Sequence, residues 1–440
     1  MSKRGVKTIL AVMVSAGALS GPLTSHAAGF AIIEQSVSGL GNSFAGVAAS
    51  GEDATDMFYN PANMTQLSGT HYALGAHIIV PYTKFSGSAT VSGVVPVSGG
   101  NGGDAGQVVA VPNFYYVRDL SPTMKFGLGI NAPFGLETEY DRNWVGRYHA
   151  VKSQLQTVNI NPAIATHIND RLSFGVGLNV QYMRAELTQA VDFAAICTAY
   201  SIGSCAGTPT TNDGFSRVKG DDWSWGYNLG LLYEVDPSTR LGAAYRSKMD
   251  QKLTGTARFS NTPAALQFAN QFVDSNVRAD ITLPETVMLG AWHRVNARLA
   301  VMGGATWTRW SRFQELRIRY DSSQPDTVQP EQWKNSWRYS LGATYEYNSH
   351  WTLRGGVAYD ETPIPSAALR TPRIPGNNRK WISVGAGYHP SMNVTVDLAY
   401  AHLFVSTTPI NNTNATASTL SGSFDSHVDI VSAQVQWHFQ

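Results

Sequence analysis

The sequence predicts an all-β protein: an antiparallel transmembrane β-barrel of about 14 strands, with an N-terminal plug in its lumen. Two observations predict this fold. Segments with one apolar and one polar face recur along the chain, and aromatic residues mark the ends of the apolar faces. Charged residues make up only 14% of the chain, against about 25% in soluble domains. A strand between lipid and an aqueous lumen needs two such faces, with aromatic girdles at the interfaces.

The stretch 223–235 shows this pattern most clearly. Its odd positions, from Trp223 to Val235, are all apolar, and its even positions are mostly small or polar. A period of two residues indicates a β-strand, because successive side chains point to opposite faces. The same alternation returns at 337–347, 351–360 and 431–439.

The N-terminus has the three parts of a secretory signal: basic residues, a short apolar run over 9–19, and small residues before position 28. We expect residues 1–27 to be removed as a signal peptide and the mature chain to begin at Ala28. The run is too short to span a bilayer as a helix. An exported β-barrel implies the outer membrane of a Gram-negative bacterium.

The next segment, 28–69, is rich in Gly, Ala, Ser and Asn and does not alternate as a strand does. A barrel of about 14 strands has a lumen wide enough to leak unless something fills it. We therefore expect this N-terminal segment to fold into the lumen as a plug, or hatch, and residues 70–440 to form the barrel.

The barrel region divides into strand candidates joined alternately by short turns and long loops. Short turns belong to the periplasmic side and long loops to the extracellular side, with both termini in the periplasm. The strand candidates lie near 70–82, 107–118, 123–137, 152–169, 171–190, 222–235, 238–256, 277–294, 297–320, 333–347, 349–360, 379–389, 391–404 and 427–439.

The two cysteines, Cys197 and Cys205, stand close together in one irregular stretch. In an exported chain this spacing favours a disulfide that closes a small loop, with two free thiols as the alternative. We expect no metal site, because no further ligand stands at a useful spacing, and no cofactor. The net charge of +1 gives no reason to expect a nucleic-acid partner.

Two of the long loops are less polar than loops usually are. Residues 191–202 include Phe193 and Ile196, and residues 264–273 place Phe268 and Phe272 at helical spacing. The loops could pack on each other to close the mouth of the barrel, or form an exposed apolar groove that captures a ligand. The two interpretations are compatible.

Several short motifs follow one another along the chain. They are Ala28-Gly29-Phe30, Ser38-Gly39-Leu40-Gly41, Asn60-Pro61-Ala62, the block 131–140, the block 223–234, Tyr245-Arg246-Ser247, Leu283-Pro284-Glu285, the block 307–311, and the block 371–375 followed by Trp381. In this order the motifs resemble the FadL family of outer-membrane transporters (FadL/TodX type), which carry long-chain fatty acids and, in some members, aromatic hydrocarbons. The resemblance covers essentially the whole mature chain.

The resemblance implies a passive route for an apolar substrate. The loop groove catches the substrate, which moves to a lumen pocket beside the start of the hatch, at Gly29 and Phe30. Hatch movement, with the Asn60-Pro61-Ala62 motif as part of the gate, opens a gap in the wall where the third strand is kinked. Pro133 and Gly135 suit that kink, because proline removes a ladder donor and glycine permits a bend.

A fatty acid carries a carboxylate, so basic side chains in the lumen are candidate partners. By alternation we expect Arg246, Lys248, Arg338 and Arg354 to point inward, where they could instead pair with lumen acids such as Glu234, Glu346 and Asp360. Gln189 and Gln329 stand where the family resemblance leads us to look for two further basic residues. This favours a neutral hydrocarbon relative to a fatty acid.

The leading hypothesis is therefore a long-chain fatty acid channel, with a toluene-like hydrocarbon channel as the alternative. An enzyme such as a lipase is disfavoured because the eleven histidines form no recognisable triad motif. An adhesin would need longer and more polar loops. We expect a monomer in contact with outer-membrane lipid and lipopolysaccharide.

Overall fold

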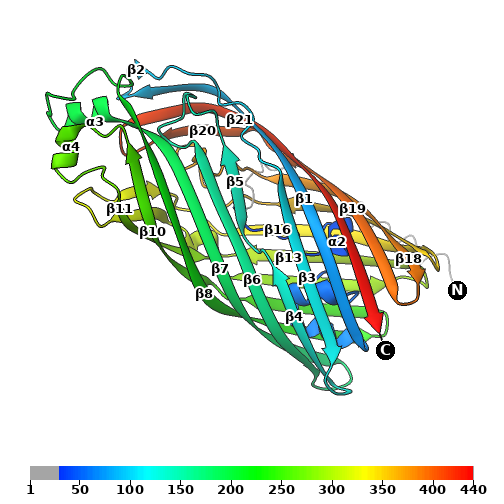
Figure 1. Cartoon of the computed structure of the whole chain (residues 1–440). Coiled ribbons are helices and arrows are strands. Elements are labelled where there is room, and N and C mark those ends of the chain that lie inside the picture. Colours follow the sequence, from blue (N-terminus) through cyan, green and yellow to red (C-terminus); the bar gives the residue numbers. More distant parts are fainter. Residues whose placement is uncertain (1–28, 440) are drawn as a thin grey trace.

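The computed structural model describes residues 29–439, which form one closed antiparallel barrel (Figure 1). Its wall has 14 strands, so the predicted fold class is confirmed. The predicted signal peptide, residues 1–27, lies outside the described residues. No helix within 29–439 is long and apolar enough to cross a membrane.

Each wall strand pairs with the next along the chain, and the last pairs with the first over its full length, from Thr70↔Phe439 to Val91↔Ser418. Five wall strands are interrupted and carry two labels each. The strands of the wall are β1 (Thr70–Val91), β3 (Val109–Asp119), β4 (Met124–Asn131) with β5 (Gly135–Glu139), β6 (Lys152–His167), β7 (Leu172–Asp192), β8 (Asp213–Asp236), β9 (Thr239–Arg246) with β10 (Met249–Ser260), β11 (Ser275–Leu283) with β12 (Thr286–Arg294), β13 (Leu299–Thr308) with β14 (Glu315–Tyr320), β16 (Ser336–Asn348), β17 (Trp351–Asp360), β18 (Arg379–Ser391), β19 (Val394–Val405) with β20 (Thr408–Thr413), and β21 (Ser418–Phe439). Two short strands, β2 (Val95–Pro96) and β15 (Thr327–Pro330), form hairpins with β1 and β14.

Several strands extend further toward the long loops than the sequence predicted. β1 continues to Val91, β8 begins at Asp213 and β21 begins at Ser418, so parts of the predicted loops 83–106, 191–221 and 405–426 are strand. In these extensions the outward positions carry polar residues such as Arg217. The alternation of apolar outward residues with polar inward residues, which identifies a membrane strand in a sequence, is therefore missing there.

The outer surface of the wall is apolar in its middle band. Along β8 the outward side chains from Trp223 to Val235 are all more than a third exposed, with Trp225 at 72%. Such exposure is unfavourable in water and favourable in lipid, so this band marks the part of the wall that lies in the hydrocarbon.

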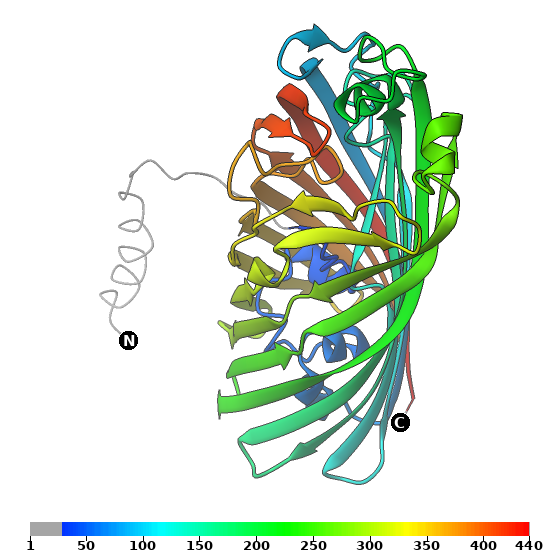
Figure 2. The same cartoon turned by 90° about the vertical axis from the view of Figure 1, so that its left-hand side faces the viewer.

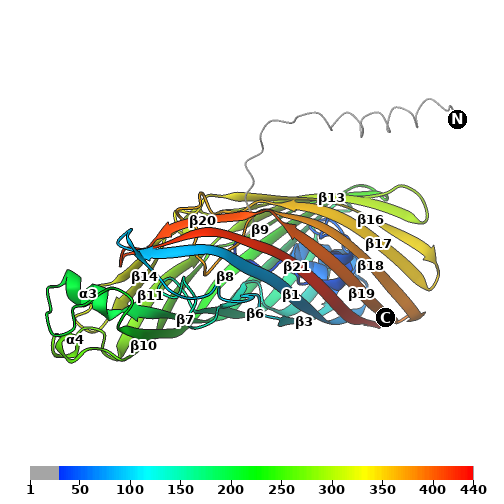
Figure 3. The same ribbon diagram turned by 90° about the horizontal axis from the view of Figure 1, so that it is seen from above.

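The N-terminal segment lies inside the barrel, where Figures 2 and 3 show its short helices surrounded by wall strands. These are α2 (Val37–Gly41), η2 (Ala54–Phe58) and η3 (Pro61–Gln66). Leu40, Phe44 and Met64 pack in one buried cluster with wall residues such as Tyr115 and Trp381.

The long loops gather at one end of the barrel, called the loop end here, and the C-terminus lies at the other, the turn end (Figure 1). The loop end holds α3 (Phe193–Ala199) and α4 (Ala264–Phe268).

A charge in the middle of the apolar band should destabilise the barrel. Leu229 lies midway between Trp223 and Val235, so Leu229→Arg should cost about 2–4 kcal/mol, the penalty for an arginine at the bilayer midplane. Denaturant unfolding in lipid vesicles measures this cost. Asn276→Arg, on the exposed face of β11 near the loop end, is the control and should cost under about 1 kcal/mol. Equal costs would contradict this placement of the membrane.

Candidate site: a lumen pocket, its plug and a break in the wall

The third wall strand is broken between β4 and β5, at Ala132-Pro133-Phe134. β4 pairs with both neighbours, β3 and β6. β5 has a ladder only with β6 among the described strands, apart from an isolated bridge between Gly106 and Thr138. Proline has no N–H to donate, so the ladder stops at Pro133. β3 and β5, which are neighbours in the wall, are therefore not joined by a continuous ladder of hydrogen bonds.

The first described residues of the N-terminal segment cover this break from inside. The Ile32 N–H donates to the Pro133 carbonyl at 2.9 Å, and the Gly135 N–H donates to the Phe30 carbonyl at 3.0 Å. Ala31 thereby forms an antiparallel bridge with Phe134. The Gln35 side chain adds a third hydrogen bond by donating to the Ala132 carbonyl at 2.8 Å. Residues 30–35 thus supply the backbone partners that the broken strand lacks.

Phe30 is the anchor of this contact and is only 5% exposed. Its ring lies 4.9 Å from the ring of Trp310, 5.9 Å from those of Phe313 and Trp333, and 6.1 Å from that of Phe134. Buried aromatic side chains of this size contribute strongly to packing. The start of the N-terminal segment is therefore held in an aromatic cage that reaches from the break to the loops after β13 and β15.

A cavity of about 460 Å³ adjoins both the cage and the break. Phe30, Ile32 and Phe134 line it on one side, and Leu155 and Val158 of β6 on another. This volume lies in the range of sites for small molecules, about 300–1,000 Å³. The cavity is mostly apolar, and its lining includes both Ala31 and Phe134, the bridge partners at the break.

A smaller cavity of about 90 Å³ shares Ala31 and Ile32 with the first cavity; it is also mostly apolar but has charged side chains in its lining. Arg246 and Arg338 both line it, together with Glu34, Asp360 and Trp381. Arg338 donates to the Ser43 carbonyl and lies over the rings of Phe44 and Trp381.

Arg246 is set apart by its partners. Its guanidinium donates to the Asn179 side chain and, at 2.7 Å, to the Phe58 carbonyl, and it stacks over the Phe58 ring. Within residues 29–439 no carboxylate lies within ion-pair distance of it. A largely buried cation without an anion is costly, and here only neutral acceptors and an aromatic ring offset that cost.

The other two predicted basic residues do not join this cavity. Arg354 points inward but forms an ion pair with Asp397 at 2.7 Å, and it lines a separate cavity at the turn end. The prediction that Lys248 points inward is wrong: it is exposed and pairs with Asp250 at 2.6 Å. β9 ends at Arg246, and Ser247 bonds to Tyr227 through both its backbone and its hydroxyl. This interruption resets the alternation, so that Met249 faces inward and Lys248 outward.

The Asn60-Pro61-Ala62 motif joins the N-terminal segment to the wall. Asn60 caps η3 by accepting from the Ala62 N–H at 2.9 Å, and it donates to the carbonyls of Ala48 and of Leu231 on β8. Glycine stands at the wall positions in contact, since a Cβ at Gly230 would collide with the Asn60 side chain. The close approach of plug and wall therefore depends on the absence of a side chain there.

The four predicted groove residues divide between core and surface. Phe193 and Ile196 are buried in a cluster with Leu266, and the rings of Phe193 and Phe272 meet at 5.3 Å. These three therefore join the two loops to each other. Phe268 is 93% exposed at the end of α4 and is the member of the set that is open to a ligand.

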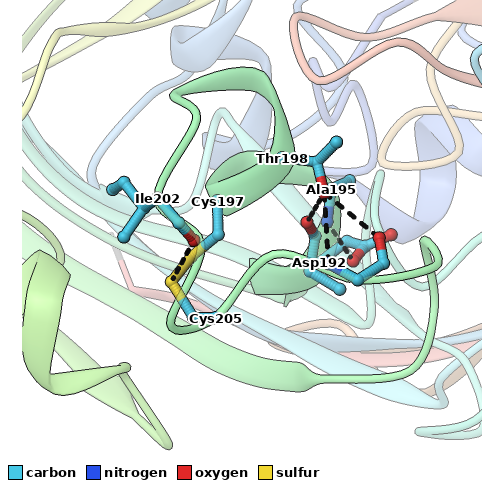
Figure 4. The surroundings of a disulfide bond; sticks show 8 residues. Asp192, Ala195, Cys197, Thr198, Ile202 and Cys205 are labelled. Atoms are coloured by element: carbon cyan, nitrogen blue, oxygen red, sulfur yellow. Dashed lines mark hydrogen bonds between the residues drawn. A yellow bond between two sulfur atoms is a disulfide. The ribbon is translucent and has the colours of Figure 1, made fainter.

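The expected disulfide between Cys197 and Cys205 is present and closes the turn that follows α3 (Figure 4). Asp192 caps the same helix by accepting from the Ala195 N–H at 3.0 Å. Cross-link and cap fix the loop that carries Phe193 and Ile196.

Gln35 and the aromatic cage residues Trp310, Phe313 and Trp333 are not among the site residues predicted from the sequence. A block containing Trp310 was noted, but nothing in its pattern connects it to Phe30. Arg373 lies in the block 371–375 but was not expected to contact Gln189; its guanidinium donates to the Gln189 side chain at 2.6 Å. A guanidinium thus lies beside a position where the resemblance had suggested a basic residue.

One Ser-His-Asn chain exists in the wall: His77 contacts Ser432 at 2.7 Å and Asn113 at 3.1 Å. All three are at most 2% exposed, and none lines the cavities described above. A substrate has no access to this serine, so the chain acts as packing between β1, β3 and β21. Residues 29–439 hold no cluster of ligands suited to a metal ion.

A closed antiparallel barrel with an apolar outer band, an internal plug and a break in its wall defines an outer-membrane channel protein. The comparisons agree. Residues 19–439 match the model of the outer membrane protein transport protein family (OMPP1/FadL/TodX), and the chain belongs to this family.

The chain is 29% identical to a long-chain fatty acid transport protein of Escherichia coli O6:H1, over 92% of each chain. It is 30% identical to a putative outer membrane protein of Neisseria meningitidis serogroup B, over 94% of this chain and 95% of the relative. The crystal structure of a Pseudomonas aeruginosa FadL homologue superposes with a TM-score of 0.88 at 27% identity, covering 94% of this chain and all of the other. The Ralstonia pickettii toluene transporter TbuX, at 22% identity and a TM-score of 0.66 over 91% of this chain and 99% of its own, shares the fold.

Removing the Asn60 side chain should loosen the plug without unfolding the barrel. Asn60→Ala deletes a helix cap and two buried hydrogen bonds, which together should lower the free energy of local opening by about 2–4 kcal/mol. Hydrogen exchange of residues 60–67 measures this change. Ser50→Ala, which removes a 3.4 Å bond to the Val47 carbonyl and a side-chain hydrogen bond to Asp56 but leaves the cap of η3 in place, is the control. Equal exchange in both variants would contradict the anchoring role of Asn60.

The aromatic cage should loosen as the pH rises. Burial raises the pKa of Glu331 to about 8, and its carboxyl accepts from the Trp333 indole at 2.9 Å. A carboxyl whose pKa is raised in the folded state stabilises that state fully below its ordinary value of about 4.5, and the contribution is lost as the pH rises toward 8.

Exchange of the amides of residues 331–335 should therefore accelerate, beyond its intrinsic pH dependence, between about pH 5 and 8. Glu331→Gln keeps a neutral group of similar shape and should abolish this extra acceleration. A wild-type profile that matches that of the variant would show that Glu331 does not control the cage.

Proposed function

We propose that this protein is a passive outer-membrane channel for long-chain fatty acids. The observation that carries the proposal is Arg246, a largely buried guanidinium without a carboxylate partner, on the wall of the cavity beyond the apolar pocket. A fatty acid would supply the missing anion through its headgroup, while its chain occupies the pocket of about 460 Å³. The relatives named as fatty acid transport proteins support the same substrate.

The N-terminal segment, predicted as 28–69, is proposed to act as the hatch. It covers the break in the wall through hydrogen bonds that residues 30–35 make with Pro133 and Gly135. A chain that enters the pocket competes with Phe30 for the aromatic cage. Displacing Phe30 would draw residues 30–35 away from the break and uncover it.

The substrate is then proposed to leave sideways, between β3 and β5, into the membrane. The pocket extends to this region, since Val109 and Ala110 of β3 and Leu136 of β5 line it. An apolar chain would thus pass from pocket to lipid without crossing water, which the hydrophobic effect favours.

A neutral hydrocarbon is the second candidate substrate. The mostly apolar lining of the larger cavity favours it, since such a pocket needs no charge partner. Gln189 and Gln329, where the family resemblance led us to look for basic residues, point the same way. Surface capture, for either substrate, is proposed to begin at the exposed Phe268 on α4.

The setting of the channel belongs to the same proposal. The loop end faces the outside of a Gram-negative cell and the turn end the periplasm, as the lengths of the connections indicate. The barrel works as a monomer, in contact with outer-membrane lipid and lipopolysaccharide, and catalyses no reaction.

Uptake of labelled oleate and of labelled toluene, in cells lacking their own channels, separates the two substrates. Arg246→Met should lower oleate uptake roughly tenfold or more, because a buried hydrogen bond to a charged group contributes about 1.5–3 kcal/mol. Toluene uptake should not change. Lys248→Met, two residues away but on the outer wall, is the matched control and should leave both unchanged. Unchanged oleate uptake in the Arg246→Met variant would contradict the proposal that the channel carries fatty acids.

A further inference from the structure

The outer wall carries a group of basic side chains just beyond the apolar band, toward the loop end. We call it the basic face; it consists of Arg184 on β7, Arg217 and Lys219 on β8, and Lys252 and Arg258 on β10. β8 pairs with β7 on one side and β10 on the other, so these side chains lie on adjacent strands. Four of the five are exposed, and Lys219 is partly exposed.

The register fixes the arrangement of the basic face. Tyr182 lies opposite Trp223, with ring centroids 5.3 Å apart, and Arg184 and Asp221 form the next outward pair toward the loop end. On the other side of β8, the Lys252 N–H donates to the Asp222 side chain at 2.7 Å, so Lys252 is level with Trp223. Arg184 and Lys252 therefore flank the edge of the aromatic girdle from both sides.

The charges of this face are not balanced within the protein. Five cations share it with two carboxylates, Glu186 and Asp221, and Glu186 pairs with both Arg217 and Lys219. Two further carboxylates adjoin Lys252: Asp280 lies directly opposite it on β11, and Asp250 lies two residues before it on β10. Both are already paired, with Arg319 and Lys248. Arg184, Lys252 and Arg258 have no ion pair within the described chain. Arg258 also lies directly opposite Arg217 in the register, and like charges so placed repel each other. An anion between these cations would relieve the repulsion.

The height of the face on the wall indicates which anion. Trp223 and Trp225 are 59% and 72% exposed and mark where the hydrocarbon ends. The outward positions from Trp223 to Arg217 span six residues, or about 20 Å of strand. Cations in this zone lie where the phosphates of membrane lipids lie, and Arg and Lys are the usual partners of phosphate.

We propose that the basic face binds the phosphorylated headgroup of an outer-leaflet glycolipid, the lipid A part of lipopolysaccharide. Arg184 and Lys252 hold a phosphate at the edge of the girdle, with Arg217, Lys219 and Arg258 as a second group of cations further out. An acyl chain of the same lipid lies below, along Tyr182 and Trp223. The inference rests on the orientation proposed above, with the loop end outside the cell.

Binding of lipid A to the purified, delipidated barrel tests this site. The probes are diphosphoryl lipid A and its dephosphorylated form, added in detergent and followed by native mass spectrometry. Arg184→Gln combined with Lys252→Gln should weaken binding of diphosphoryl lipid A about tenfold or more. The dephosphorylated lipid should bind weakly to wild type and variant alike. Arg184→Lys combined with Lys252→Arg should retain binding, because the charges remain.

The control variant combines Lys380→Gln, on the outer wall of β18, with Arg298→Gln, at the turn end, and removes the same charge elsewhere. It should bind diphosphoryl lipid A as wild type does. Equal binding by both charge-removing variants, or equal loss in both, would overturn the assignment of this face. Oleate uptake is read separately: it should not change in either variant, so failure of the lipid site and failure of the fatty-acid proposal are distinguishable.

Discussion

The structure depends on the need to satisfy backbone hydrogen bonds in a wall that faces lipid. Hydrocarbon offers no partners, so a membrane barrel has to close its ladder all the way round. Pro133 interrupts that ladder, and residues 30–35 replace the missing partners from inside. The plug therefore has two tasks at once: it fills the lumen and it completes the wall. In the function proposed above, movement of residues 30–35 would therefore also expose the break in the wall.

Two contacts anchor the plug to the rest of the protein. One anchor is Phe30 in its aromatic cage, beside the cavity that would receive a substrate. The other is Asn60, bonded to the carbonyl of Leu231 on the far side of the segment. An apolar chain in the cavity can compete with Phe30 but does not touch Asn60. The proposed movement therefore involves the start of the segment, while its remainder stays in the lumen.

The part of the fold that lies in lipid could be predicted from the sequence, since lipid outside and water inside impose a period of two on strands such as 223–235. The prediction weakened wherever that constraint ends. Toward the loop end from the aromatic girdle, Arg217 and its neighbours point outward into a polar zone. The strand extensions there lack the apolar outward face from which the other strands were predicted. At Lys248 a one-residue interruption after Ser247 reversed the alternation. The aromatic cage joins Phe30 to Trp310 and Trp333, which lie about 280 and 300 residues further along the chain in the connections after β13 and β15, and no local pattern connects them.

The central claim is that residues 30–35 have to leave the break before the wall opens. Ala31 and Phe134 are antiparallel bridge partners whose own backbone groups do not bond each other; pairs of this kind have Cα atoms about 4.5 Å apart, which suits a disulfide. The most direct measurement is oleate uptake by an Ala31→Cys, Phe134→Cys variant, oxidised and then reduced. The account predicts that oxidation abolishes uptake and reduction restores it, while wild type, with its native disulfide, responds to neither. Full uptake by the cross-linked barrel would contradict the account.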